Sequence, residues 1–430
     1  MFESIIGFAG LLGLIFLRVP VAFAMMIVGV VGFGLTVGWK PSLISAAQAA
    51  VHSTQEYSLL VIPLFLLMGN LISRAGLSAR LYDASNAWLG HRRGGLARAT
   101  IVSCAGFSAV CGSSLATTAT MARIAVPEMN RLGYSRELAA GSIAAGGTLG
   151  ILIPPSVIMV MYGVLTQTDI AALFIAGVIP GLLGILFYNL AVTIVTRLKP
   201  DSGPAGMHVE WGEKWRSLLG VWEILLLFIL VIGGIYVGLF TPNEAAGVGA
   251  FGALLSVVFR RTATLWEIID VFYETAILSA ALVTVLIGAF VFSSFLNMTG
   301  MPREIGAFVS GNGFPAWAVM ALIIVAYVLL GMVLDSISMI LLTIPVFFPL
   351  VQFYGFDPIW FGIIVVVVTE ISLITPPVGM NIFVLANVVP DLRIGTIYRG
   401  VIPFVLVDLL RLALLLAFPA ISLTLPAMMN

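Results

Sequence analysis

The feature that most limits how this chain can fold is a series of apolar runs, each about twenty residues long, with few charges between them. Only 9% of the 430 residues are Asp, Glu, Lys or Arg, and the mean hydropathy is +1.13. Because lipid offers no hydrogen-bond partners, such runs must form helices that satisfy their own backbone groups. A membrane β-barrel would need short segments of alternating polarity instead. The chain is therefore predicted to be an all-α polytopic membrane protein.

Ten of these runs are predicted to cross the membrane. They are Ser4–Leu17, Val19–Val37, Leu59–Ile72, Glu137–Met161, Ile170–Thr196, Trp222–Leu239, Thr241–Phe259, Ala276–Met298, Ile359–Ala386 and Val401–Leu423. The first run lacks the basic start and the cleavage site of a signal peptide, so we expect it to be retained as a span. Thr262–Thr275 has opposite apolar and acidic faces and is predicted to lie in the membrane interface, although an ordinary loop helix fits it nearly as well.

Two further apolar stretches, Gly95–Pro127 and Ala316–Pro349, are too long for one helix and contain the polar interruptions CGSS (111–114) and LDSIS (334–338). Arginines flank the first stretch on both sides: Arg74, Arg80, Arg92, Arg93 and Arg98, then Arg123, Arg131 and Arg136. Since cytoplasmic loops are rich in Lys and Arg, both ends should be cytoplasmic, which makes residues 95–130 a re-entrant hairpin. Continued alternation predicts a second hairpin, at 316–353, that enters from the opposite side.

An internal repeat supports this topology. Adding 222 carries Pro20 to Pro242, Pro127 to Pro349, and the Pro154-Pro155 pair to Pro376-Pro377. We therefore predict two repeats, at residues 1–198 and 220–430, joined by a polar cytoplasmic linker at 199–219. Each repeat would hold one hairpin and one broken crossing helix, at about 137–166 and 359–388. Equivalent segments start on opposite sides of the membrane, and this inverted arrangement is typical of transporters.

The double prolines predict what the broken helices do. Proline removes an amide proton and clashes with the preceding turn, so it frees backbone carbonyls at membrane depth. In transporters with inverted repeats, freed carbonyls coordinate sodium and helix N-termini point at anionic substrate groups. The hairpin tips would add oxygen ligands, from Ser113, Ser114, Thr117 and Thr118 at the first break and from Asp335, Ser336, Ser338 and Asn381 at the second. Hard oxygen ligands without a His or Cys cluster favour an alkali cation, so sodium is the only metal expected.

Four charged residues inside apolar segments allow functional and structural interpretations. Asp335 is predicted to bind the ion, because a carboxylate in the membrane interior is costly and usually functional; a paired or exposed carboxylate is the alternative. Glu370 fits either support of the second ion site or a packing role. Arg123 is expected to reach back to the cytoplasmic interface, and Asp408 with Arg411 to form a structural ion pair.

Four sequence stretches resemble the large membrane subunit of tripartite ATP-independent periplasmic (TRAP) transporters: GSSLATTATM, AAGGTLGILIPPSVIMVMYG, GLFTPNEAAGVGA and LITPPVGMNIFV. The resemblance covers essentially the whole chain. It implies an elevator-type, sodium-coupled importer in the bacterial inner membrane. It also implies a separate small four-helix membrane subunit and a periplasmic substrate-binding protein that delivers an organic acid, such as a C4-dicarboxylate or a sialic acid.

The resemblance also implies site residues. The first sodium site would involve Gly112, Ser113, Ser114, Gly147, Thr148 and Gly150. The second would involve Asp335, Ser336, Ser338, Thr369, Thr375 and Gly379. The substrate would bind between the tips, near Ser113, Ser114, Pro154, Ser156, Pro376 and Asn381.

Other functions have less support in the sequence. The net charge is zero, so the sequence does not indicate the basic surface that nucleic-acid binding requires. It also lacks the GxxxxGK[ST] phosphate-binding loop of an ATP-driven pump. An intramembrane hydrolase would need a serine with an embedded histidine or a pair of membrane aspartates. His52, His91 and His208 fall in predicted loops, and Asp335 has no obvious second acid. We expect no enzyme activity and no cofactor. Cys104 and Cys111 should lie about 10 Å apart along one helix, too far for a disulfide, and are expected to be packing residues. A passive channel and a sodium/carboxylate symporter without a binding protein remain the alternatives to a TRAP importer.

Overall fold

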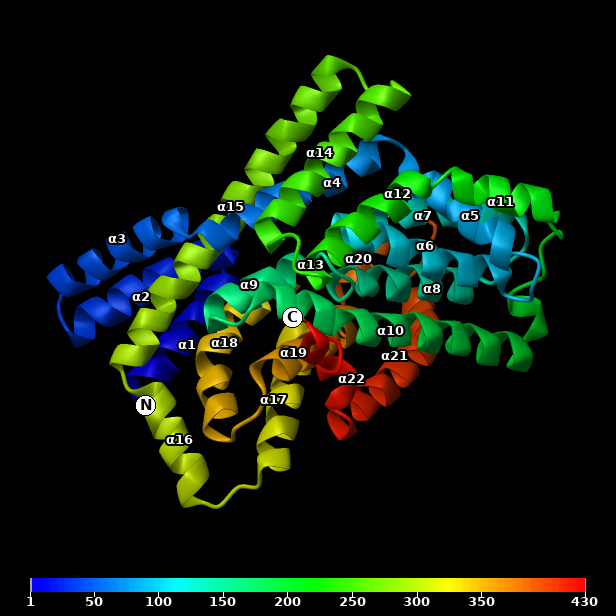
Figure 1. The fold of residues 1–430 in the computed structure, drawn as a ribbon. Helices are drawn as coiled ribbons and strands as arrows, with labels where there is room; N and C mark the ends of the chain where they lie inside the picture. The colour runs from blue at the N-terminus through cyan, green and yellow to red at the C-terminus, as the bar shows by residue number, and fades with distance from the viewer. Residues whose placement is uncertain (1, 430) are drawn as a thin grey trace.

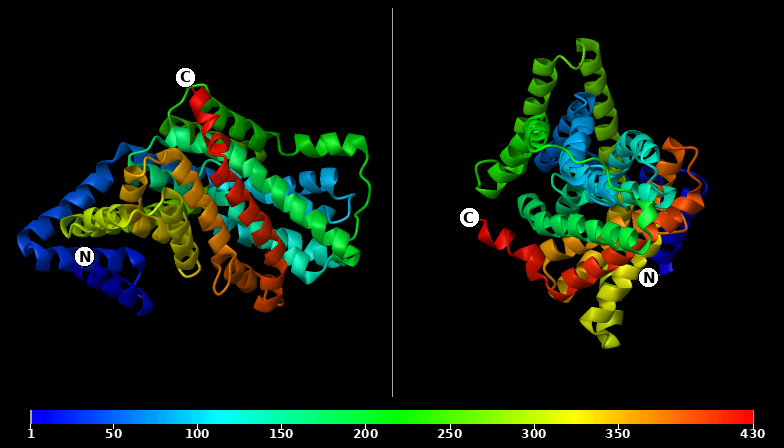
Figure 2. Two further views of the ribbon diagram at one scale, coloured as in Figure 1. Left: turned by 90° about the horizontal axis from the view of Figure 1, so that it is seen from below. Right: turned by 90° about the vertical axis from the view of Figure 1, so that its right-hand side faces the viewer.

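The computed structural model describes residues 2–429, and these residues fold into helices joined by short connections (Figure 1). Ser4–Leu17 and most other predicted runs coincide with helices. The helices pack into two groups, which we call the outer group and the inner group. Two shorter helices lie beside the inner group: α5 (Leu77–Leu89) packs against α6, and α11 (Trp211–Leu219) packs against α5. Helices α3 and α11 lie at opposite ends of the molecule (Figures 1 and 2).

The outer group is built on one helix, α15 (Leu265–Met298), which packs against α2, α3 and α4. Its other members are α1 (Phe2–Phe16), α2 (Val21–Thr36), α3 (Trp39–Gln55), α4 (Val61–Arg74), α12 (Trp222–Phe228), α13 (Gly234–Tyr236) and α14 (Pro242–Arg260). Helix α16 (Met301–Gly311) follows α15 and packs against both α15 and α18 of the inner group. One π-helical turn, Ile229–Gly233, connects α12 to α13. A capping box begins α14, with Thr241 and Glu244 bonding each other's backbone, and a second, Thr264 with Glu267, begins α15.

The inner group contains the two predicted hairpins. The first is α6 (Gly95–Cys111) with α7 (Ser114–Arg131), and the second is α17 (Ala316–Gly331) with α18 (Ser336–Phe353). The ends of each pair meet: the Tyr134 hydroxyl accepts a hydrogen bond from the Leu96 amide at 3.1 Å, and the Tyr354 hydroxyl donates to the Phe314 carbonyl at 2.8 Å. Both pairs are therefore hairpins that return to the end from which they start.

Both predicted broken helices are interrupted at their double prolines. The first consists of α8 (Arg136–Thr148), a 3₁₀ turn (Leu149–Ile151) and α9 (Val157–Thr166). The second consists of α19 (Pro358–Leu373) and α20 (Met380–Val388). The Pro154–Pro155 and Pro376–Pro377 peptide bonds are both cis. Long helices, α10 (Ile170–Leu198) and α21 (Ile394–Ala417), follow the two breaks, and α22 (Ala420–Leu423) follows α21.

The two halves of the inner group are interleaved. Helix α7 of the first hairpin packs against α20 of the second broken helix, and α18 of the second hairpin packs against α9 of the first. Helix α8 also packs along α21. Each half of the chain therefore completes the surroundings of the other half's break. The inverted orientation of the halves in a membrane stays a prediction.

The helix boundaries correct three expectations. Thr262–Thr275 is not a separate interfacial helix, because α15 runs without interruption from Leu265 through the predicted span Ala276–Met298. His52 lies within α3 rather than in a loop. The last long helix starts at Ile394, earlier than the predicted Val401.

By length and composition, six described helices can cross a membrane, or seven if the bent pair 211–219 and 222–236 counts as one span. Helices α1 and α2 are shorter apolar helices.

Candidate ion and substrate site

The tip of the first hairpin lies directly against the break in the first broken helix. Gly112 ends α6 with φ +62°, a left-handed conformation that favours glycine. A Cβ atom built on Gly112 would lie 2.9 Å from the Pro155 carbonyl oxygen, and one built on Gly150 would lie 3.2 Å from the Ser113 carbonyl oxygen. The missing side chains thus let backbone oxygens of the tip and the break approach one another.

Hydroxyl groups line the same contact. A Cβ atom on Gly147 would lie only 1.9 Å from Thr118 Oγ1, and one on Gly150 would lie 3.0 Å from Ser108 Oγ. Thr118 is fully buried and its hydroxyl has no hydrogen-bond partner among the described residues. An unpaired buried hydroxyl is costly, so this oxygen is available to a ligand.

The second hairpin tip is organised by Asp335. The Asp335 carboxylate caps α18, where one oxygen accepts hydrogen bonds from the Ile337 amide at 3.2 Å and the Ser338 amide at 3.1 Å. Ser336 follows at the start of α18, and both it and Asp335 are half-buried. The arrangement places a carboxylate and the N-terminus of a helix at one point.

At the second break, Ser372 lies against this hairpin, whereas the other predicted groups make their contacts within the break and its own helix. A Cβ atom on Gly331, at the end of α17, would lie 2.1 Å from Ser372 Oγ on α19. Gly379 has φ +64°, and a Cβ atom there would lie 3.1 Å from the Leu373 carbonyl and 3.3 Å from the Thr375 carbonyl. Thr369 is fully buried and its hydroxyl donates to the Val365 carbonyl at 2.8 Å. The Thr375 hydroxyl donates to the Ile371 carbonyl at 2.5 Å.

Asn381 connects the two halves of the site. Its side-chain oxygen accepts a hydrogen bond from the Ser114 hydroxyl at 2.7 Å, and its amide donates to the Ala144 carbonyl at 3.1 Å. Asn381 therefore contacts the first hairpin and α8 and does not face the second break as expected. The structure brings together two residues predicted to bind substrate, Ser114 and Asn381.

The remaining residues predicted to bind substrate differ in exposure between the two breaks. Pro154 and Ser156 are buried at the first break, where Ser156 caps α9 and donates to the Ile151 carbonyl at 2.5 Å. Pro154 also lines an apolar groove between α6, α10 and α12. Pro376 is exposed at the second break. The Thr148 hydroxyl points away from the first tip, to the Tyr188 hydroxyl at 3.0 Å, so only the Thr148 backbone remains suited to an ion site there.

Comparison with known proteins identifies the family of this chain. Residues 8–421 match the model of the DctM component of tripartite ATP-independent periplasmic transporters. The chain belongs to this family. It is therefore a transporter subunit of the inner membrane and not an enzyme.

Individual TRAP permeases are similar over nearly their full length. The C4-dicarboxylate TRAP transporter large permease protein DctM of Pseudomonas aeruginosa is 39% identical over 387 residues, 90% of both chains. The sialic acid TRAP transporter large permease protein SiaM of Vibrio cholerae is 32% identical over 97% of both chains. The crystal structure of the YdaH transporter of Alcanivorax borkumensis has the same fold, with a TM-score of 0.66, 17% identity and 90% of each chain covered.

One signature stretch of this TRAP permease has a structural role. TPNEAAGVGA begins α14: Thr241 and Glu244 form its capping box, and the Asn243 amide donates to the Tyr57 carbonyl at 2.7 Å, joining α14 to the chain before α4.

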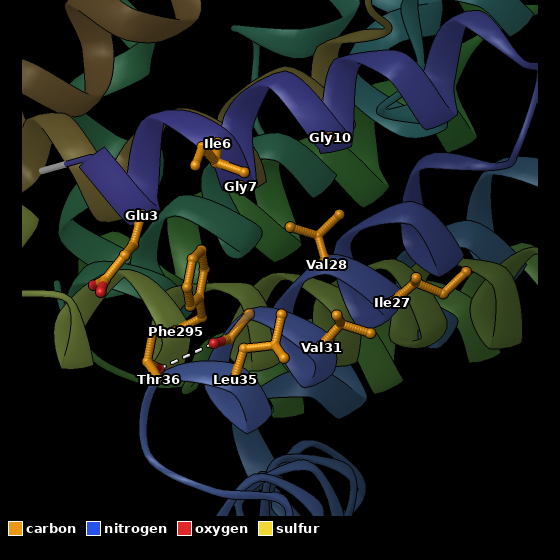
Figure 3. Close-up of a pocket in the computed structure, with 11 residues that line it drawn as sticks. Glu3, Ile6, Gly7, Gly10, Ile27, Val28, Val31, Leu35, Thr36 and Phe295 are labelled. Atoms are coloured by element: carbon orange, nitrogen blue, oxygen red, sulfur yellow. Dashed lines mark hydrogen bonds between the residues drawn. The ribbon is translucent and has the colours of Figure 1, made fainter.

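One cavity outside the hairpins lacks the polar groups that an organic acid would need. It has a volume of about 320 Å³ and lies between α1 and α2, with Phe295 of α15 forming one wall (Figure 3). The Phe295 ring fits between Gly7 and Gly32, where Cβ atoms would lie 2.5 Å and 2.6 Å from it. Because its lining is almost wholly apolar, it is not suited to an organic acid.

Sequence reasoning missed one group of polar residues in this TRAP permease. The predicted ion pair Asp408–Arg411 is present, at 2.9 Å, but Arg411 also pairs with Glu370, and the Tyr188 hydroxyl donates to Asp408. Glu370 therefore takes part in a buried ion pair. A tyrosine within the apolar run of α10 was the available signal for Tyr188, because a buried Tyr hydroxyl usually has a partner.

Proposed function

We propose that this chain imports an organic acid across the inner membrane, driven by sodium, with a small membrane subunit and a periplasmic substrate-binding protein as partners. The observation that supports this most directly is the contact between the first hairpin tip and the first break. There Gly112, Gly147 and Gly150 bring backbone oxygens and hydroxyls together, and the buried Thr118 hydroxyl lacks a partner. Such oxygen-rich surroundings suit an alkali cation.

The second cation would bind at the tip of the second hairpin, with Asp335 as its charged ligand. Ser336, Ser338, Thr369, Thr375 and Gly379 are the proposed neighbours. A carboxylate ligand makes cation binding favourable at membrane depth, where an uncompensated charge is costly. Occupation of both sites would place positive charge on either side of the space between the tips.

The proposed substrate is an organic acid held between the tips. In the first half, the α7 N-terminus, capped by Ser113, lies at the hairpin tip, and the α9 N-terminus, capped by Ser156, lies at the break. Helix N-termini attract anions, and bound sodium would add to that attraction. The relatives named for C4-dicarboxylate, sialic acid and 2,3-diketo-L-gulonate make these acids the first to test.

An uptake assay tests the proposal. The chain is reconstituted into proteoliposomes with its small subunit, and a labelled acid is added with or without the binding protein and with or without an inward sodium gradient. We expect uptake only when the binding protein and the inward sodium gradient are both present. Uptake without the binding protein would favour a sodium/carboxylate symporter, and uptake that needs neither would favour a channel.

The elevator movement is also part of the proposal. The inner group would move as one body against the outer group, carrying both hairpins and both breaks. The difference in exposure between the buried first break and the exposed Pro376-Pro377 supports a site that opens to one side at a time.

A further inference from the structure

A fully buried polar network lies behind the candidate site. It runs from Thr148 at the end of α8 through Tyr188 on α10 to Asp408 and Arg411 on α21, and it ends at Glu370 on α19. All five side chains are inaccessible to solvent. The network therefore joins four helices of the inner group through side chains alone.

The two ends of the network are equivalent in the internal repeat. Adding 222 to Thr148 gives Glu370, just as it relates the double prolines that follow each residue by six positions. Each end lies in the half-helix that precedes a break. The network thus links the same point of the two broken helices across the two halves of the chain.

Each end also lies behind a hairpin contact. On α8, the neighbouring Gly147 faces Thr118 of the first hairpin, while Thr148 faces Tyr188. On α19, Ser372 faces Gly331 of the second hairpin, while Glu370 faces Arg411. A movement of either half-helix that altered its contact with a hairpin would therefore also strain the network.

The surroundings hold the network in one arrangement. Gly184 on α10 leaves room for the Arg411 guanidinium, since a Cβ atom there would lie 2.1 Å from Nη1. The Tyr188 ring packs edge-on against Phe404, with centroids 5.6 Å apart. Buried ion pairs often contribute little net stability compared with apolar packing, and in some proteins they instead fix one arrangement of the helices.

We propose that Tyr188, Asp408 and Arg411 are positioning residues that hold the ends of α8 and α19 together, so that cation binding at one hairpin favours binding at the other. This inference rests on the two sodium sites of the proposed function. It adds that the sites are coupled through the buried side of the inner group rather than only through the substrate between the tips.

Sodium binding to the purified protein tests the coupling. Sodium is titrated by isothermal titration calorimetry, with choline chloride holding ionic strength constant, for the wild type, Tyr188→Phe and Tyr162→Phe, and the melting temperature of each variant is measured without sodium. Tyr188→Phe keeps the ring and removes the hydroxyl that joins Thr148 to Asp408. Tyr162→Phe is the matched control, because it removes another largely buried hydroxyl, bonded at 2.6 Å to the Pro358 carbonyl, that lies outside the network.

We expect cooperative sodium dependence in the wild type and in Tyr162→Phe. In Tyr188→Phe, the half-saturating sodium concentration should rise on the order of fivefold, and the Hill coefficient should fall toward one. If the two variants lose similar stability but keep the same sodium dependence, the network is only structural and the inference is overturned. A wild type without any sodium dependence would instead overturn the proposed function, and this inference with it.

A double-mutant cycle locates the effect. Thr148→Val removes the hydroxyl at the other side of the same hydrogen bond. If the network acts as a unit, Thr148→Val combined with Tyr188→Phe should raise the half-saturating sodium concentration no further than either change alone. Multiplication of the two effects would contradict a shared pathway.

Discussion

Asp335 has two tasks that a single substitution can separate. Its carboxylate caps α18, and its negative charge would bind a cation. Asparagine caps a helix about as well as aspartate but carries no charge. The residue therefore allows the charge to be removed while the helix end stays intact.

For Asp335→Asn we expect a folded protein whose uptake needs on the order of tenfold more sodium, because the charged ligand of the second site is lost. Uptake against sodium concentration measures this. Asp357→Asn is the control, since Asp357 caps α19 in the same way, through the Ile359 amide at 2.8 Å and the Trp360 amide at 3.0 Å. Equal sodium dependence of the two variants would remove Asp335 from the ion site.

Asn381 could be predicted from the sequence as a site residue, but its hydrogen-bond partners could not. Its residue type and its place after the second double proline indicated a polar group in the site. Its partners, Ser114 and Ala144, come from the other half of the chain, and no spacing within one repeat indicates that pairing. Tyr188 was missed for the same reason, because its partner Asp408 is 220 positions away.

For Asn381→Ala we expect strongly reduced transport, since both hydrogen bonds that join α20 to the first hairpin and to α8 are lost. Asn189→Ala, which loses only a bond to the Ile185 carbonyl in its own helix, is expected to transport nearly normally. Initial uptake rates at saturating sodium measure the difference. Similar rates in both variants would show that the connection is dispensable.

At the scale of elements, the contact between α7 and α8 depends on one missing side chain. Gly147 brings α8 against Thr118, and no Cβ atom fits between them. For Gly147→Ala we expect a loss of about 1–3 kcal/mol in stability, because the helices must move apart. Thermal melting of the purified protein measures this.

Gly247 on α14 is the matched control, since a Cβ atom there has nothing within 4 Å. Gly247→Ala is expected to be at least as stable as the wild type, because alanine favours helix over glycine by about 0.5–1 kcal/mol. Adding Thr118→Ala to Gly147→Ala should restore part of the lost stability. No restoration would mean that the destabilisation arises elsewhere.

The hairpins and broken helices were the most predictable elements, because prolines, polar tips and flanking arginines mark them in the sequence. The start of α15 was not predictable in the same way. Glu267, Asp270 and Glu274 indicated a surface segment separate from the span, but a helix continues wherever its backbone bonds can form. Polarity along a helix shows where it leaves the membrane, not where it ends.

At the scale of the whole molecule, the outer and inner groups meet at the first hairpin tip. A Cβ atom on Gly69 of α4 would lie 2.8 Å from the Cα atom of Cys111, the last residue of α6. If the inner group moves past the outer group, the tip must pass this point. The close approach of two backbones leaves no space for a larger residue there.

For Gly69→Leu we therefore expect uptake to stop, because the added side chain has no space beside Cys111 and must push the first hairpin tip away from α4. Size-exclusion chromatography checks that the variant is folded. Gly247→Leu, on an open position of the outer group, should transport normally. Uptake by Gly69→Leu at the rate of Gly247→Leu would argue against movement at this contact.

The length of α15 has a consequence for the lipid around the protein. Its 34 residues span about 50 Å, whereas the hydrocarbon layer of a bilayer is about 30 Å thick. The helix must lean steeply or emerge at one end, where Trp266 and Phe272 are exposed. A thicker bilayer would draw more of this helix inward and turn α2, α3 and α4, which pack against it, so acyl-chain length becomes a determinant of the transport rate.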